Sequence, residues 1–439
     1  MGKKKILILG AGFGGLTIFN YLLRTLKKRN DVRITLINEH NFFLFSPLLH
    51  EVAVGVLLPE NIVTSVRKLY GKRISQFVQT YIKEINLVNH EVITSAGVYN
   101  YDYIVLALGG VTDISGMSNA KDNSHIFMLK TIRDAIAIKN HIMGMFEQAS
   151  IENASGKVKQ LLTFVISGAG YTGIQLAASL SDVIYKYLIS IYRQIDPSNI
   201  KIIILESTDR IIRDLPVKYS IYVMRYLQSH KIEVMLNSEV TNVSDNQIEI
   251  NQTDIIPSQT LLYVPGIVAN PVISTLNTER DSMGRVIVND YMGLENFNGA
   301  YAVGDCSHFQ DKERGLVARP RAHIAVRQAR IAAHNLVADI RGNKKKKYHY
   351  SDSSEIISLG RSNALLRVYK FWFRGILAVI VGVISYSLLA IGKKNRVIIL
   401  VDWILSRIFG PDTAVIQPQD IGLQLGEDID RPNITCSSG

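Results

Sequence analysis

Two glycine-rich segments of one type carry the clearest chemical signal in this chain. Each follows an apolar run, at residues 6–9 and 164–167, and their sequences are Gly10-Ala11-Gly12-Phe13-Gly14-Gly15 and Gly168-Ala169-Gly170-Tyr171-Thr172-Gly173. In a turn from a strand to a helix, the first glycine allows the tight turn, the second lets the backbone approach a pyrophosphate, and the third lets the helix pack on the strand. The helix N-terminus then faces the anion. Two such segments predict two dinucleotide sites in one protein, and therefore electron transfer between the two dinucleotides.

Each glycine segment needs flanking elements to hold it. We predict strands over 6–9 and 32–37 with a helix over about 16–28 between them. A second unit repeats this order, with strands over 164–167 and 201–206 and a helix that begins at Ile174. A carboxylate or amide at the end of the second strand of such a unit can bind the ribose of the dinucleotide.

Three residues are candidates for this ribose contact. Asn38 and Glu39 both stand at the strand end of the first unit, and both remain open. Glu206 stands at the strand end of the second unit. The distance in sequence from the second glycine segment to Glu206 exceeds the usual spacing of about 20 residues, and a longer helix and loop between them would explain this. Because a carboxylate repels a 2′-phosphate, Glu206 favours NADH over NADPH.

Two later segments complete the first unit. Residues 103–110, which include Ala107 and Gly109, are typical of a buried strand that ends in glycines. Residues 300–305 predict a short strand that ends in Gly304 and Asp305, where the aspartate can bind a ribityl hydroxyl. We therefore predict an α/β fold with two Rossmann-like dinucleotide-binding domains, the second inserted in the first. The first domain comprises residues 1–115 and 296–345, and the second comprises residues 116–295.

Composition limits the class of protein. The chain has 439 residues, 47% of them hydrophobic, and a formal net charge of +11, which suits two or three domains with sizeable cores. The basic residues are scattered apart from the run at 344–347, so we expect no nucleic-acid partner. Cys306 and Cys436 are far apart in sequence, which predicts no disulfide framework, no metal site and no paired redox thiols. No signal-peptide pattern precedes the first strand, so we expect a reducing, cytoplasmic location.

The C-terminal region, residues 346–439, differs in composition and is predicted to anchor the protein to a membrane. Residues 375–392 carry no charge, and this run is at the lower limit for a transmembrane helix, which needs roughly 20 residues. A spanning helix, a buried core element and an in-plane anchor are therefore all open. Residues 397–409 combine apolar residues at helical spacing with Trp403 and Arg407, as in helices that lie in the membrane interface. We expect one-sided attachment, with a true span as the alternative.

In this order, the segments resemble the type II NADH:quinone oxidoreductases, the single-chain alternative NADH dehydrogenases of respiratory membranes. The resemblance covers nearly the whole chain. Besides the glycine segments, it rests on the Pro-Leu-Leu-His-Glu-Val-Ala block at 47–53, on residues 302–305 and 319–328, and in the tail on residues 360–364, 395–396 and 402–403. The block at 47–53 is fairly specific to this family, whereas many flavoproteins share the glycine segments.

The resemblance implies a noncovalent FAD in the first domain, NADH as substrate in the second, and a quinone that is reached from the membrane side. It further implies peripheral or monotopic attachment to the cytoplasmic face of the cell inner membrane, and it is compatible with a homodimer through the tail. The residues implied for FAD are Gly10, Gly12, Phe13, Gly14, Gly15, Asn38 or Glu39, Pro47, Ala107, Gly109, Gly304 and Asp305. Those implied for NADH are Gly168, Gly170, Tyr171, Gly173, Gln175, Glu206 and Gly266.

The quinone is expected around a helix that starts near Ala322, and the sequence departs from the family pattern there and at two other places. His323 and Arg327 replace two glutamines, whereas Gln328 matches. Histidine can donate a proton near neutral pH, so we assign His323, Arg327 and Gln328 to quinone contact or proton supply, with a structural role for His323 as the alternative. Gln175 stands in place of a glutamate. Residues 263–266 replace a tryptophan and an alanine-glycine pair but keep Gly266.

The function implied is hydride transfer from NADH to a flavin, followed by delivery of two electrons and two protons to a quinone without proton pumping. Two alternatives stand beside it. One is a sulfide- or other-donor quinone reductase of the same superfamily, which would need cysteines near the flavin. The other is a catalytically weak membrane redox sensor, which the altered residues Gln175, His323 and Arg327 suggest.

Overall fold

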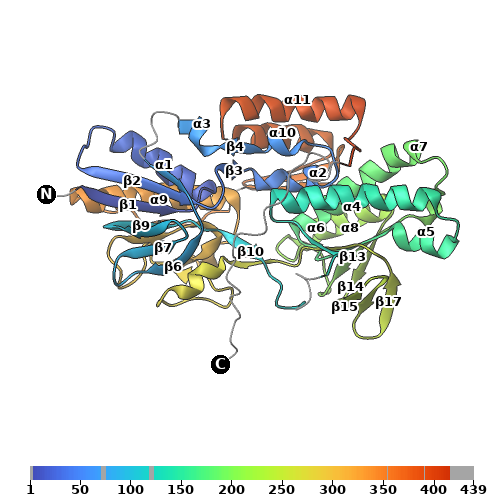
Figure 1. Cartoon of the computed structure of the whole chain (residues 1–439), viewed down its shortest axis with the longest axis horizontal. Coiled ribbons are helices and arrows are strands. Elements are labelled where there is room, and N and C mark those ends of the chain that lie inside the picture. Colours follow the sequence, from blue (N-terminus) through green and yellow to red (C-terminus); the bar gives the residue numbers. More distant parts are fainter. Residues whose placement is uncertain (1–2, 71–75, 118–122, 353, 390, 416–439) are drawn as a thin grey trace.

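The computed structural model describes residues 3–70, 76–117, 123–352, 354–389 and 391–415, and Figure 1 shows how its elements are arranged. Two five-stranded parallel sheets stand towards the two ends of its long axis. Two C-terminal helices lie across the side that is uppermost in Figure 1. The fold is thus of the α/β class, as predicted, with a helical pair added at the C-terminal end.

The first sheet is built around β1 and has the order β21-β9-β1-β2-β5, with all neighbouring strands parallel. Its strands are β1 (Lys4–Leu9), β2 (Val32–Asn38), β5 (Phe77–Gln79), β9 (Tyr103–Leu106) and β21 (Ala300–Ala302). Helices α1 (Phe13–Thr25) and α9 (Ala322–Arg341) pack against each other beside it. The last four residues of β1 are all buried, as expected for a parallel strand that is covered on both faces.

The second sheet repeats this design, with the order β11-β18-β12-β13-β14 and parallel neighbours throughout. Its strands are β11 (Ile126–Met128), β12 (Thr163–Ser167), β13 (Lys201–Glu206), β14 (Ile232–Leu236) and β18 (Leu261–Tyr263). The helices α4 (Ile132–Ile151), α6 (Tyr171–Val183) and α8 (Val217–Ser229) belong to the same unit. Each sheet also has a three-stranded antiparallel sheet near it, formed by β6 (Ile82–Asn86), β7 (Glu91–Thr94) and β8 (Gly97–Asn100), and by β15 (Val240–Ser244), β16 (Gln247–Ile250) and β17 (Asp254–Pro257).

The chain passes between the sheets along two paired strands. β10 (Gly110–Thr112) follows β9 of the first sheet, and β19 (Ile267–Ala269) follows β18 of the second sheet. β10 and β19 pair with each other as antiparallel strands. They approach closely at Gly110, where an added Cβ would lie 2.5 Å from the carbonyl oxygen of Val268. The chain then returns to the first sheet, because β21 pairs with β9.

The helices after the glycine segments begin earlier than the sequence predicted. α1 begins at Phe13 and α6 begins at Tyr171, because Gly12 and Gly170 are the N-cap residues. The third glycine of each segment therefore belongs to the helix itself.

The C-terminal region consists of an antiparallel sheet and two helices, namely β25 (Ser354–Ser358), β26 (Ala364–Val368), β27 (Phe371–Arg374), α10 (Ile376–Leu389) and α11 (Lys393–Phe409). Side chains tie this region to the rest of the molecule. Asn395 Nδ2 donates to Thr64 Oγ1 (2.7 Å). After α11, the Asp412 N–H donates to the carbonyl of Gly55 (2.8 Å), and the Asp412 carboxylate accepts from Lys139 Nζ (2.5 Å).

The uncharged run at 375–392 does not form one long helix. α10 has 14 residues, and Gly392 precedes α11 as its N-cap. Among the residues that the structure describes, no helix has both the length and the apolar character needed to cross a membrane.

Candidate functional site

The first glycine segment forms a tight cradle at the start of α1. Gly10 has a φ of +100°, and a Cβ added to it would lie 2.3 Å from the carbonyl oxygen of Ala107. A Cβ on Gly15 would lie 1.8 Å from the carbonyl oxygen of Gly10. By contrast, a Cβ on Gly12 would meet nothing within 4 Å, and no side chain caps the helix there. Within the described part of the chain, α1 thus has an uncapped N-terminus with room beside Gly12, which suits an anion site.

The second glycine segment repeats this cradle position by position. Gly168 has a φ of +105°, and its added Cβ would lie 2.6 Å from the carbonyl oxygen of Val264. A Cβ on Gly173 would lie 2.0 Å from the carbonyl oxygen of Gly168, whereas one on Gly170 would meet nothing within 4 Å. No side chain caps α6, and its first turn contains no acidic residue. Among the described residues, neither helix thus has a side-chain cap or an acidic first turn at its positive end.

The residues at the strand ends show which residue of the first unit is equivalent to Glu206 of the second unit. Asn38 Oδ1 accepts from the N–H of Ala11 (2.8 Å), and Glu206 Oε2 accepts from the N–H of Ala169 (2.9 Å). Asn38 is therefore the counterpart of Glu206. Glu39 follows it and is exposed. The first unit has a neutral amide where the second has a carboxylate.

The middle residues of the two segments differ in what they contact. The ring of Phe13 packs edge-on against Phe43 and Phe45, with ring centroids 5.0 and 5.6 Å apart. Pro47 follows in a short 3₁₀ helix over Ser46–Leu48. Tyr171 instead directs its hydroxyl towards Glu355 of the C-terminal sheet. Phe13 thus belongs to the packing of the first unit, and Tyr171 connects the second unit to the C-terminal region.

Gly304 and Asp305 form a turn that α9 supports. Gly304 has a φ of +76°, and its N–H donates to Gln328 Oε1 (2.8 Å). Gln328 is 2% exposed, so its side chain holds this turn. Asp305 Oδ2 lies 3.8 Å from Lys130 Nζ. The structure therefore gives Gln328 a role in positioning the Gly304–Asp305 turn that its match to a quinone-site pattern did not predict.

His323 and Arg327 lie on α9, whose first residue is Ala322, and both contact the segment that leads into β25. His323 Nε2 is 3.4 Å from Asp352 Oδ1, and Arg327 donates to the carbonyl of Ser351. Burial favours the neutral form of Asp352, but His323 and the charges of Arg321 and Arg367 outweigh it and hold the pKa of Asp352 below its ordinary value.

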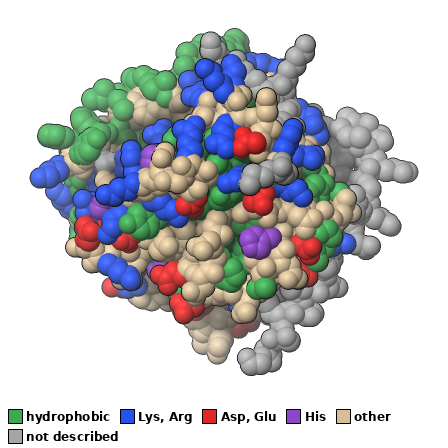
Figure 2. All heavy atoms as spheres, turned by 90° about the vertical axis from the view of Figure 1, so that its left-hand side faces the viewer, with side chains coloured by type: hydrophobic (Ala, Val, Ile, Leu, Met, Phe, Trp, Pro, Cys, Tyr) green, Lys and Arg blue, Asp and Glu red, His purple; other side chains and the backbone are tan. Residues whose placement is uncertain are grey.

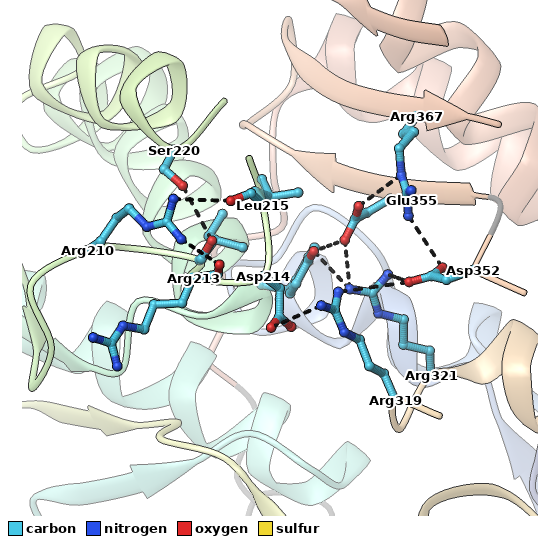
Figure 3. A network of polar contacts seen from close by, with 12 residues as sticks. Arg210, Arg213, Asp214, Leu215, Ser220, Arg319, Arg321, Asp352, Glu355 and Arg367 are labelled. Carbon is cyan, nitrogen blue, oxygen red and sulfur yellow. Dashed lines mark hydrogen bonds and ion pairs between the residues drawn. The ribbon is translucent and has the colours of Figure 1, made fainter. Parts of the chain in front are cut away.

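These contacts belong to a larger charged network that the sequence did not reveal. Figure 3 shows Arg319 and Arg321 between the second unit and the C-terminal sheet. Arg321 pairs with Glu355 (2.7 Å) and Asp352 (3.1 Å), and Arg319 pairs with Asp214 (3.3 Å). The network joins three parts of the chain that are distant in sequence, so its residue spacing alone could not have predicted it.

Gln175 is buried between the second unit and the C-terminal region. With its amide oriented to suit its neighbours, it donates to the carbonyl of Tyr171 and accepts from the N–H of Ser358, both at 3.3 Å. Its side chain also contacts Tyr386 of α10. Gly266, the remaining predicted NADH residue, follows β18, and a Cβ there would meet nothing within 4 Å. Gly109, which has a φ of +69°, is equally open.

An apolar pocket lies between α2 (Leu49–Val52), the C-terminal sheet and helices α10 and α11, and its lining includes Ser358 and Tyr386, which contact Gln175. Leu48, Val379, Ile399 and Trp403 are among the residues that line it, and Glu51 contributes a carboxyl group. Burial raises the pKa of Glu51 to about 7, and the charges of Arg361 and Arg407 oppose this shift. Sequence reasoning included Glu51 in the block at 47–53 but did not single it out.

The family is settled by comparison with known proteins. Residues 4–329 match the sequence profile described as "Pyridine nucleotide-disulphide oxidoreductase". The chain belongs to this family. That assignment agrees with the two equivalent cradles and with the two parallel sheets that carry them.

Individual relatives cover almost the whole chain. It is 28% identical over 425 residues to the "Type II NADH:quinone oxidoreductase NdhA" of Mycobacterium tuberculosis, which covers 92% of this chain and 87% of that protein. It is 26% identical to the "Probable NADH dehydrogenase" of Dictyostelium discoideum, which covers 94% of this chain and 91% of that protein.

Two solved structures share the fold. The structure of NDH2 from Plasmodium falciparum in complex with NADH superposes with a TM-score of 0.84 at 19% identity, and covers 94% of this chain and all of that one. The sulfide:quinone oxidoreductase of Aquifex aeolicus gives a TM-score of 0.72 at 18% identity, and covers 93% of this chain and 96% of that one.

The name of the pyridine nucleotide-disulphide oxidoreductase family refers to a disulfide, which makes the cysteines of this member informative. Cys306 is fully buried, and burial raises the pKa of its thiol to about 11. It is therefore a protonated, inaccessible thiol near neutral pH. Cys436 lies outside the described residues. Within the described part of the chain, no group of His, Cys, Asp and Glu side chains is arranged to bind a metal ion.

Proposed function

We propose that this chain is an NADH:quinone oxidoreductase that holds a noncovalent FAD in its first nucleotide-binding unit and oxidises NADH bound in its second unit. The observation that carries the proposal is the pair of equivalent cradles, each with an open glycine at an uncapped helix N-terminus. The names of the relatives from M. tuberculosis and D. discoideum support the same reaction. The reaction is NADH + H⁺ + quinone → NAD⁺ + quinol, without proton pumping.

The first cradle fits the pyrophosphate of FAD. Gly10 and Gly15 allow the close turn, and the open side of Gly12 leaves room for an anion at the helix end. We assign Asn38 to a ribose contact and Asp305 to a ribityl hydroxyl; the hydrogen bond between Asn38 Oδ1 and the N–H of Ala11 supports the first assignment. When bound, FAD would supply the two-electron redox chemistry.

The second cradle fits NADH better than NADPH. Glu206 stands at its strand end with one oxygen on the Ala169 N–H and the other on the hydroxyl of Thr208 (2.7 Å), and its remaining lone pairs can accept ribose hydroxyls. A 2′-phosphate would need a cation there. Arg210, the nearby candidate, donates instead to the carbonyls of Arg213 (2.6 Å) and Leu215 (3.2 Å) within its own loop (Figure 3).

We further propose that the quinone binds in the apolar pocket and that the C-terminal helices attach the protein peripherally to the cytoplasmic face of the cell inner membrane. Figure 2 shows hydrophobic side chains gathered at the top of the molecule, on the side of α10 and α11, with Lys and Arg side chains below them. Such an arrangement suits an apolar face in lipid and basic groups at anionic headgroups. The exposed apolar residues of the two helices include Ile376, Leu377, Ile380, Ile384, Val397, Val401, Ile404 and Ile408.

The domain division and the oligomeric state belong to the same proposal. We assign residues 1–115 and 296–345 to the FAD domain, 116–295 to the NADH domain and 346–439 to membrane anchoring. The pairing of β21 with β9 supports the return of the chain to the first domain. A homodimer through the C-terminal region stays a prediction.

The decisive experiment is anaerobic flavin spectroscopy on the purified protein. We expect a yellow protein that NADH bleaches and that a quinone then reoxidises. A colourless protein that takes up no flavin would refute the proposal. Bound flavin that NADH leaves oxidised would favour a redox sensor or another donor. Sulfide as that donor is disfavoured, because Cys306 is a buried thiol.

A further inference from the structure

Glu51 occupies an unusual position in the apolar pocket. Its side chain is only 15% exposed, and among the described residues that line the pocket it alone carries a carboxyl group. Its neighbours on the wall come from the 3₁₀ helix over Ser46–Leu48, from strands β25 and β26 and from helices α10 and α11. They include Leu48, Val379, Tyr386, Ile399 and Trp403. A buried carboxyl group in such a place normally costs stability unless it is neutral or paired, so its presence calls for a function.

The proposed reaction has a need that such a group could meet. A hydride carries two electrons and one proton, whereas conversion of a quinone to a quinol consumes two electrons and two protons. One proton for each turnover must therefore come from an acid other than NADH. Gln175, at the adjoining contact of α6 and β25, has an amide that does not serve as an acid. Burial raises the pKa of the Tyr386 phenol, which makes it a poor acid.

We infer that Glu51 is the residue that delivers this second proton to a quinone oxygen in the pocket. In the step, the carboxyl O–H bond of Glu51 breaks and an O–H bond of the quinol forms, while the electron pair originates from NADH. Solvent then returns a proton to the carboxylate through the exposed edge of the side chain. This inference rests on the proposed NADH:quinone activity and names the acid in that reaction.

The surroundings of Glu51 allow both of its charge states. Burial raises its pKa to about 7, so both the acid and its conjugate base are populated near neutral pH. The guanidinium groups of Arg361 and Arg407 lower the pKa and would stabilise the carboxylate after proton transfer. Nε and Nη2 of Arg407 are buried and have no hydrogen-bond partner among the residues that the structure describes, and the guanidinium lies 3.9 Å from the ring centroid of Trp403. These unused donors strengthen the case for an anion that forms transiently nearby.

Apart from the two arginines, the other titratable groups described around Glu51 are either neutral near pH 7 or held in ion pairs. His50 Nε2 lies 3.9 Å from Glu51 Oε1, but burial lowers the pKa of His50 to about 4, so it is neutral near pH 7. Asp182 of α6 accepts from the N–H of Arg361 (2.6 Å) and pairs with Lys186 (2.6 Å). On the α4 side, Lys139 pairs with Asp412. Among the described residues that line the pocket, Glu51 is thus the carboxylic acid, and its pKa of about 7 makes its proton available near neutral pH.

The test compares Glu51→Gln with Glu60→Gln, a change at an exposed glutamate in the same stretch of chain. The flavin of each purified protein is photoreduced, so that NADH is not required, and is then mixed anaerobically with decylubiquinone at a series of pH values. In the wild type and in Glu60→Gln, the reoxidation rate should be high below pH 7 and fall as the pH rises through about 7, because Glu51 loses its proton there. Glu51→Gln should be slower by about 10²–10⁴-fold and lack this pH step. Glu51→Asp should recover part of the rate.

A second readout does not depend on turnover. Infrared difference spectra of the flavin-containing protein should show a protonated carboxyl band that titrates near pH 7 and is missing in Glu51→Gln. Reoxidation of Glu51→Gln at the wild-type rate and with the wild-type pH profile would overturn the role of Glu51 while leaving the proposed function intact. A wild-type protein whose reduced flavin does not react with the quinone would overturn both. Flavin content and NADH bleaching in Glu51→Gln report whether the variant is correctly folded.

Discussion

At the scale of single residues, the central glycines Gly12 and Gly170 are expected to be needed for nucleotide binding but not for folding. A Cβ on Gly170 meets no protein atom within 4 Å, yet it would project into the space that a pyrophosphate needs. Gly170→Ala should therefore leave the melting temperature almost unchanged and weaken NADH binding by tenfold or more, about 1.4 kcal/mol, with the flavin retained. Gly12→Ala should instead lose the flavin.

The matched control is Gly156→Ala in α5 (Ser155–Leu161), where a Cβ also meets nothing within 4 Å. Isothermal titration with NADH and flavin absorbance would measure the two effects. Unchanged NADH affinity in Gly170→Ala would contradict the assignment of the second cradle.

Glu206 tests the choice of nucleotide at the same scale. Glu206→Gln keeps an oxygen that can accept from the N–H of Ala169 but removes the negative charge that would repel a 2′-phosphate. We expect the ratio of kcat/KM for NADH over NADPH to fall by about tenfold, which corresponds to about 1.4 kcal/mol. Steady-state assays with both nucleotides would show this, and an unchanged ratio would mean that Glu206 does not face the ribose.

At the scale of elements, α11 depends on polar ties to the first unit. Asn395 Nδ2 donates to the carbonyl of Val63 (2.8 Å) as well as to Thr64 Oγ1. Asn395→Ala leaves both acceptors without this donor, which should cost about 1–2 kcal/mol. Faster amide hydrogen exchange in α11, with little change in β1, is the expected signature. Lys394→Ala, at an exposed neighbour, should leave exchange unaffected, and equal exchange in both variants would argue against the tie.

Elements also show where sequence reasoning succeeded and where it failed. The strands around both glycine segments were predictable, because a short apolar run precedes each segment and another follows it at the distance expected for a strand-helix-strand unit. The helix starts were wrong by one turn, since a glycine can serve as an N-cap without a side-chain signal. Gln328 contacts Gly304, and α10 and α11 surround Glu51; both arrangements join residues that are far apart in sequence. No local pattern could have placed these side chains together.

At the scale of the whole molecule, the exposed apolar face of α10 and α11 predicts how the protein meets lipid. Ile404 is 52% exposed on α11. Ile404→Asp would place a charge against the acyl chains at a cost of about 3 kcal/mol, so co-flotation with vesicles that contain anionic lipid should fall by about two orders of magnitude. Bleaching by NADH should persist.

Ile255→Asp provides the comparison, because Ile255 is 56% exposed on β17 of the second unit. This variant should float with vesicles like the wild type. Equal losses in both variants would assign binding to general surface charge and not to the C-terminal helices.

The two sides of α10 also couple the pocket to its surroundings. Val379 and Val383 line the cavity, and the very next residues along the helix, Ile380 and Ile384, point outwards. If a detergent displaces or tilts α10, the side chains that line the cavity move with it. The apparent KM for the quinone should therefore differ between detergent micelles and lipid bilayers, because the medium around the outer face of α10 affects the shape of the pocket on its inner face.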